Sequence, residues 1–214
     1  MKITLAGSRH FGVETLNMMR GHGIEVIRVV VADGEDRLAA AARAAGIEVV
    51  VQAKPKLIVA SEIAPGTDLI VTAHSHALVS EGALKASKHG GIGYHPSLLP
   101  RHRGIAAVEW TIKEGDAIAG GTIYHLSERL DAGAIAAQDW VFVKKNETAR
   151  ELWERALAPL GLRLLAQVID QAKTSGNLPS MPQDEQFATN APRLDAEKRL
   201  DKATPHAAPK SAAS

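Results

Sequence analysis

Apolar residues follow two periods along the first hundred positions. Short runs rich in branched apolar residues predict strands at residues 3–6, 25–31, 47–51, 69–71 and 92–94. Between them, apolar residues recurring every three or four positions predict helices at 11–20, 36–45, 56–63 and 80–87. Strict alternation with short connections indicates parallel strands joined by right-handed helical crossovers. We therefore expect an α/β domain, mostly parallel, with helices on both faces of the sheet.

The pattern changes after Gly104. A helix is predicted at 105–114, followed by strands at 121–126 and 136–143 with no helix between them, which indicates an antiparallel edge on the sheet. Thr148 and Glu151 match a capping box that opens a long helix, and Pro159 predicts a kink in it. From about residue 175, Pro, Ala, Lys and Asp dominate. We expect one domain at 1–175 and an extended, partly disordered tail at 176–214.

Composition and charge exclude several classes of protein. The chain has 25 Lys and Arg against 24 Asp and Glu, so no strong field attracts nucleic acid or a membrane surface. It has no cysteine, which excludes disulfides, thiolate catalysis and zinc–thiolate sites. The apolar run near the N-terminus is too short for a signal peptide, and none resembles a membrane span. We expect a soluble, cytoplasmic protein without nucleic-acid or membrane partners; its oligomeric state stays open.

The stretch from Gly91 to Gly104 carries candidate chemistry. His95 ends a predicted strand, and Pro96 keeps it in extended geometry. Asp131 also follows a predicted strand, and a carboxylate beside an imidazole favours the protonated ring and fixes its tautomer. A protonated histidine can stabilise an oxyanion or donate a proton. The spacing alone favours a strand-end histidine bonded to the backbone and an aspartate in a turn.

Two other groups of residues allow more than one interpretation. His74 and His76, two positions apart, point the same way in an extended segment, so with His95 they form a candidate metal site. H-x-H pairs are also common in loops without a metal. Arg101 and Arg103, with His102 between them, precede a predicted helix and suit a carboxylate or phosphate of a substrate, or else form a solvated loop.

Two segments carry a resemblance. His-Pro-Ser-Leu-Leu-Pro-Arg-His-Arg-Gly at 95–104 and Leu-Asp-Ala-Gly-Ala-Ile at 130–135 resemble the folate-dependent formyltransferase family. Trp110, Gly115-Asp116 and Gly120-Gly121-Thr122 follow the same pattern. The resemblance covers roughly residues 1 to 185 and is closest to the hydrolase domain of 10-formyltetrahydrofolate dehydrogenase.

The resemblance implies a Rossmann-like formyltransferase domain and an enzyme that uses 10-formyltetrahydrofolate. It implies catalytic roles for His95 and Asp131, and an amine or water as the formyl acceptor. The residues expected around the coenzyme are Thr72, Ala73, His74, His76, Leu78, Gly93 and Tyr94. Those expected to bind the substrate are Ser97, Arg101 and Arg103, and no metal ligand is implied.

Gly93 departs from the family pattern. The transferases carry an asparagine two residues before the histidine, which supplies a donor to the formyl oxygen; losing such a donor typically costs about 10²–10³ in rate. Three functions therefore stay open: formyl transfer or hydrolysis, folate binding without catalysis, and a metal-dependent hydrolase using His74, His76 and His95.

Overall fold

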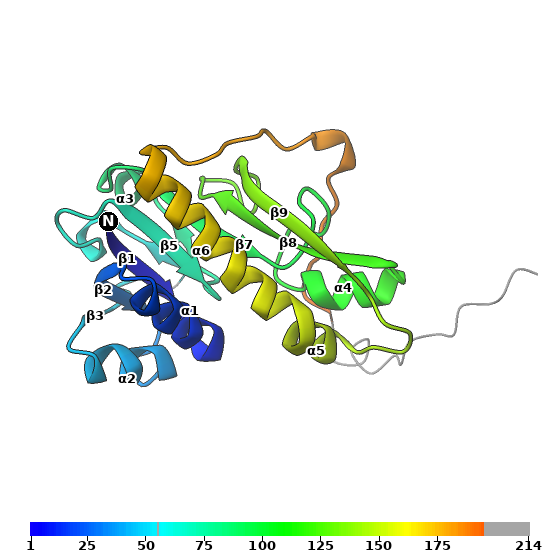
Figure 1. Ribbon diagram of the computed structural model, residues 1–214, viewed down its shortest axis with the longest axis horizontal. Coiled ribbons are helices and arrows are strands. Elements are labelled where there is room, and N and C mark those ends of the chain that lie inside the picture. Colours follow the sequence, from blue (N-terminus) through cyan, green and yellow to red (C-terminus); the bar gives the residue numbers. More distant parts are fainter. Residues whose placement is uncertain (55, 195–214) are drawn as a thin grey trace, which may run out of the picture.

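The computed structural model describes residues 1–54 and 56–194 and contains a seven-stranded mixed sheet (Figure 1). Its strands are β1 (Lys2–Gly7), β2 (Glu25–Val31), β3 (Glu48–Val51), β5 (Leu69–Ala73), β7 (Gly91–His95), β8 (Ile118–His125) and β9 (Ile135–Phe142). They lie in the order β3-β2-β1-β5-β7-β8-β9. The first five are parallel, and β8 and β9 are antiparallel. The predicted mostly parallel sheet with an antiparallel edge is confirmed.

Helices cover both faces of the sheet. They are α1 (Arg9–Gly21), α2 (Arg37–Ala44), α3 (Glu81–Lys85), α4 (Ala107–Glu114), α5 (Ala149–Leu152) and α6 (Ala158–Ser175). Because side chains alternate along a strand, Leu5 and Val71 pack in the core beneath α1 and α6, whereas Ala6 and Ile70 join Ala83 of α3 in a second cluster. No helix in the described residues is long and apolar enough to cross a bilayer.

The prediction of a helix at 56–63 is wrong. The segment forms β4 (Leu57–Ile58), which pairs with β6 (Leu78–Val79), and a 3₁₀ turn, η1 (Ala60–Glu62). The buried Glu62 carboxylate accepts the backbone N–H groups of Ala53 at 2.6 Å and Val59 at 2.8 Å. These bonds favour the short turn because they satisfy donors that a continuous helix would have to pair differently.

The long helix after residue 148 is interrupted. The capping box is present, with the Glu151 N–H donating to Thr148 Oγ1 and the Thr148 N–H donating to the Glu151 carboxylate. Between α5 and α6 lies a wider π turn, η2 (Trp153–Leu157), directly before Pro159. Since Pro159 has no N–H for the preceding turn, the hydrogen-bond ladder cannot run through unchanged. The π turn places Trp153 against Phe11 of α1, with ring centroids 5.2 Å apart.

The segment after α6 runs back along the body of the domain (Figure 1, orange). Met181 exchanges main-chain hydrogen bonds with Ile135 at the start of β9. Further along, after the turn η3 (Glu185–Phe187), the Ala191 N–H donates to the main-chain oxygen of Arg103, and the Arg103 N–H donates to that of Thr189. The described part of the predicted tail is therefore tied to the loop that follows β7, and residues 195–214 lie outside the described residues.

Candidate active site

His95 ends β7 in a buried position, 5% exposed. Its Nε2 lies 2.7 Å from the main-chain oxygen of His102. A carbonyl oxygen only accepts hydrogen bonds, so Nε2 must carry a proton. Nδ1 is therefore the ring nitrogen that can gain or lose a proton.

The loop between β8 and β9 brings Asp131 to that nitrogen. Asp131 Oδ2 lies 3.6 Å from His95 Nδ1, and both side chains are 7% exposed. The same oxygen accepts the Gly104 N–H at 2.8 Å, and Oδ1 accepts the Tyr124 hydroxyl at 2.9 Å. The two residues predicted to act together thus form a buried pair, with a donor on each carboxylate oxygen.

This pair can hold and move one proton. With Nε2–H fixed, an ionised Asp131 faces a ring that becomes an imidazolium when Nδ1 is protonated. Burial, and then the charge and hydrogen bond of Asp131, raise the pKa of Tyr124 well above its ordinary value. Tyr124 therefore remains a neutral phenol that donates to the carboxylate.

A small hollow of about 50 Å³ opens beside Asp131. It lies between the loop after β5 and the loop after β8, and three of the predicted coenzyme residues, Thr72, His76 and Leu78, line it. Tyr124 and Asp131 form part of its wall. The hollow therefore adjoins the buried pair.

The other predicted coenzyme residues lie elsewhere. Tyr94 points to the opposite face of β7, where its hydroxyl donates to the Leu157 carbonyl at 2.6 Å, and Ala73 is fully buried in β5. Gly93 lies beneath neighbouring side chains rather than against open space. We therefore do not retain Tyr94 and Ala73 as coenzyme contacts.

His74 packs against protein groups rather than in the hollow. Its ring lies 5.4 Å from that of His76 and 6.4 Å from that of Trp153. Burial, followed by the nearby positive groups His76 and Arg9, lowers the pKa of His74 to about 4. His74 is therefore neutral at physiological pH.

The predicted substrate-binding side chains are engaged within the protein. Arg103, 8% exposed, donates to Gln183 and forms a bidentate pair with Glu185. Ser97 is buried and donates to the main-chain oxygen of Arg101 at 2.5 Å. Both side chains stabilise the loop after β7 through hydrogen bonds within the protein, so we do not retain them as ligands of a substrate anion.

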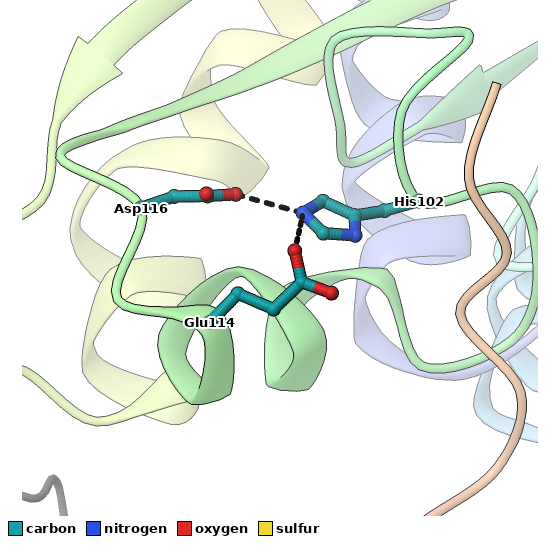
Figure 2. Close-up of side chains that lie close together, drawn as sticks. All are labelled: His102, Glu114 and Asp116. Atoms are coloured by element: carbon teal, nitrogen blue, oxygen red, sulfur yellow. Dashed lines mark hydrogen bonds and ion pairs between the residues drawn. The ribbon is translucent and has the colours of Figure 1, made fainter. Parts of the chain in front are cut away.

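Arg101 belongs to a cluster with His102, Glu114 and Asp116 (Figure 2 shows the last three). His102 Nε2 lies 2.7 Å from Asp116, and Arg101 Nη2 lies 2.7 Å from Glu114 and 2.9 Å from Asp116. In the part of the chain that the structure describes, His102, Glu114 and Asp116 form the one three-residue group with metal-ligand spacing. The Arg101 guanidinium already supplies the positive charge there, and His74, His76 and His95 form no such group.

Three contributors to the site were not predicted from the sequence. They are the Tyr124 hydroxyl, the Gly104 N–H and Gln183, whose side-chain amide donates to the main-chain oxygens of Asp131 at 2.8 Å and Gly133 at 2.7 Å. Each reaches Asp131 from a different part of the chain. Of the three, Tyr124 alone has a signal in the sequence, because it lies in the predicted strand at 121–126, next to the strand that His95 ends.

Comparisons with known proteins identify the family of the chain. The family model described as "Formyl transferase" matches residues 1–169. The chain is 35% identical over 201 residues to cytosolic 10-formyltetrahydrofolate dehydrogenase of Mus musculus, covering 88% of this chain and 22% of that protein. It thus spans about a fifth of that curated relative.

Two solved structures share the fold. Phosphoribosylglycinamide formyltransferase from Bacillus halodurans aligns with a TM-score of 0.71 at 20% identity, covering 83% of this chain and 97% of that one. The N-formyltransferase from Helicobacter canadensis, in complex with folinic acid and dTDP-3-aminofucose, aligns with a TM-score of 0.72 at 17% identity, covering 90% and 71%. At these identities the alignments establish a common architecture.

Proposed function

Because the chain belongs to the formyl transferase family, we propose that it removes the formyl group of 10-formyltetrahydrofolate and passes it to an amine or to water. The observation that carries this proposal is the buried His95–Asp131 pair, with its ring tautomer fixed by the His102 carbonyl. The relatives' names support the donor: one is a 10-formyltetrahydrofolate dehydrogenase, and one structure contains folinic acid.

The proposed reaction uses both members of the pair. The nucleophile attacks the formyl carbon, and the Nδ1–H of a protonated His95 stabilises the developing oxyanion. Asp131 accepts the proton that the nucleophile loses, and the pair returns a proton to N10 of the folate as the carbon–nitrogen bond breaks. Water as nucleophile yields formate and tetrahydrofolate, and an amine yields a formamide and tetrahydrofolate.

The hollow beside Asp131 is the proposed entry of the donor. Thr72, His76 and Leu78 from one wall would contact it. Its volume of about 50 Å³ is below the ~300 Å³ of a typical small-molecule pocket. Leu78, at the start of β6, and Leu130, in the loop after β8, are 38% and 57% exposed, and we propose that these two segments separate when the flat ring system binds.

A turnover assay tests the proposal. Tetrahydrofolate release from 10-formyltetrahydrofolate is measured with water alone and with a panel of primary amines, each with and without EDTA. We expect release that is insensitive to EDTA and abolished in His95→Ala. Binding of the donor with no turnover under any condition would instead support a folate-binding protein, and loss of turnover in EDTA would support a metal-dependent hydrolase.

A further inference from the structure

Tyr124 holds one oxygen of the reacting carboxylate. Its hydroxyl donates to Asp131 Oδ1 at 2.9 Å, while the Gly104 N–H donates to Oδ2 at 2.8 Å. With a donor on each oxygen, the carboxylate cannot rotate about its own bond without breaking a hydrogen bond. Oδ2 therefore stays directed at Nδ1 of His95, 3.6 Å away. The Tyr124 ring stands perpendicular to the His95 ring, with centroids 6.4 Å apart.

Gly93 makes the position of the Tyr124 ring possible. The two residues are direct partners across β7 and β8. A Cβ at position 93 would lie 3.2 Å from Tyr124 Cε1 and 2.5 Å from Thr72 Oγ1. A glycine in a strand often marks a place where another group approaches the backbone closely. Here the approaching groups are the Thr72 hydroxyl, which lies nearest, the Leu126 side chain at 3.2 Å and the Tyr124 ring that extends toward Asp131.

We propose that Tyr124 is a positioning residue for the reaction proposed above, acting through Asp131, and that residue 93 is glycine because the Thr72 hydroxyl and the Tyr124 ring lie over it. The inference rests on the proposed function. It also gives a reason, within this chain, for Gly93 beside the candidate catalytic histidine: the space that a side chain would need there is already occupied by Thr72 and Tyr124.

Tyr124→Phe tests the hydroxyl without changing the shape of the ring. We expect kcat for tetrahydrofolate release to fall about 10- to 100-fold, the range typical of groups that orient a reactive side chain. KM for the donor should change by no more than about twofold, because the interaction is made with Asp131 rather than with the donor.

Tyr94→Phe is the matched control. Tyr94 and Tyr124 are the only tyrosines of the chain, and the Tyr94 hydroxyl donates to the Leu157 carbonyl at 2.6 Å on the opposite face of β7. This variant also loses one hydroxyl hydrogen bond. We expect it to lower the melting temperature while leaving kcat at the wild-type value.

Gly93→Ala tests the second part of the proposal. The added methyl group should displace the Thr72 hydroxyl and the Tyr124 ring, so kcat should fall at least as far as in Tyr124→Phe. In the Tyr124→Phe background, Gly93→Ala should reduce kcat by a smaller factor than in the wild type, because the hydrogen bond of Tyr124 is already absent and only the contact with Thr72 remains to be disturbed. If Gly93→Ala does not fold, Tyr124→Phe and Tyr94→Phe still decide the role of Tyr124.

The outcomes separate this inference from the proposed function. An inactive wild-type protein refutes the proposed function and, with it, the reaction that Tyr124 would serve. An active wild type with an equally active Tyr124→Phe variant overturns the inference alone. A raised KM at unchanged kcat also overturns it, because Tyr124 would then be a contact to the donor.

Discussion

Replacing Asp131 by asparagine removes the carboxylate charge and keeps the size of the side chain. The Gly104 N–H can only donate, so the amide oxygen of the variant would stay directed at it. The amide NH₂ group would then face Tyr124, whose hydroxyl oxygen can accept a hydrogen bond. Both local contacts have a replacement, so we expect a folded protein that lacks the proton acceptor.

The distance between His95 Nδ1 and Asp131 Oδ2 gives the expected size of the loss in kcat. Two unit charges 3.6 Å apart, as in His95 and Asp131, attract each other by about 4 to 5 kcal/mol at an effective dielectric constant of about 20. Each ~1.4 kcal/mol lost from transition-state stabilisation lowers the rate tenfold. The proposed reaction requires the imidazolium of His95, so losing this attraction in Asp131→Asn should lower kcat by about 10³-fold.

The assay is tetrahydrofolate release under saturating 10-formyltetrahydrofolate, with the melting temperature measured on the same preparations. Asp139→Asn is the control, because Asp139 is an exposed carboxylate on β9 that pairs with Arg163. It should keep wild-type kcat. A folded Asp131→Asn protein with more than a tenth of wild-type kcat would refute the assignment of Asp131 as the partner of His95.

Two further variants probe the surroundings of the pair. Gln183→Ala removes the donors to the main-chain oxygens of Asp131 and Gly133, and should lower stability by about 1–3 kcal/mol and kcat by roughly tenfold. Gln186→Ala, on the same segment, should change neither, and equal effects of both in urea unfolding and turnover would contradict the role of Gln183. His74 has a pKa of about 4 in the folded protein against 6.5 for an unperturbed histidine, so the unfolded chain binds more protons between these values. Stability should fall as the pH drops from 6.5 toward 4, and His74→Asn should reduce this fall between pH 7 and pH 5 in urea titrations; an unchanged pH dependence would show that His74 is not responsible.

Local physics accounts for what the sequence alone determined. Branched apolar runs were sufficient to predict the strands of the seven-stranded sheet, because a strand with helices on both faces needs apolar side chains on both faces. The sterics of Pro96 were sufficient to predict an extended His95 at the end of β7. The two motifs around His95 and Asp131 pointed to the family, which the match over residues 1–169 confirms.

Contacts between distant residues decided the rest. Where a helix was predicted, the Glu62 carboxylate stabilises a 3₁₀ turn by accepting hydrogen bonds from two backbone N–H groups, and residue spacing does not reveal these bonds. The sequence predicted that Arg103 binds a substrate anion, but in the structure Arg103 pairs with Gln183 and Glu185, about 80 residues later in the chain. The position of Tyr124 over Gly93 depends on the register of β7 and β8, and a shift of one residue would place that side chain on the other face. Strand register and long-range hydrogen bonds are properties of the assembled chain, so only the tertiary structure could show which groups surround the pair.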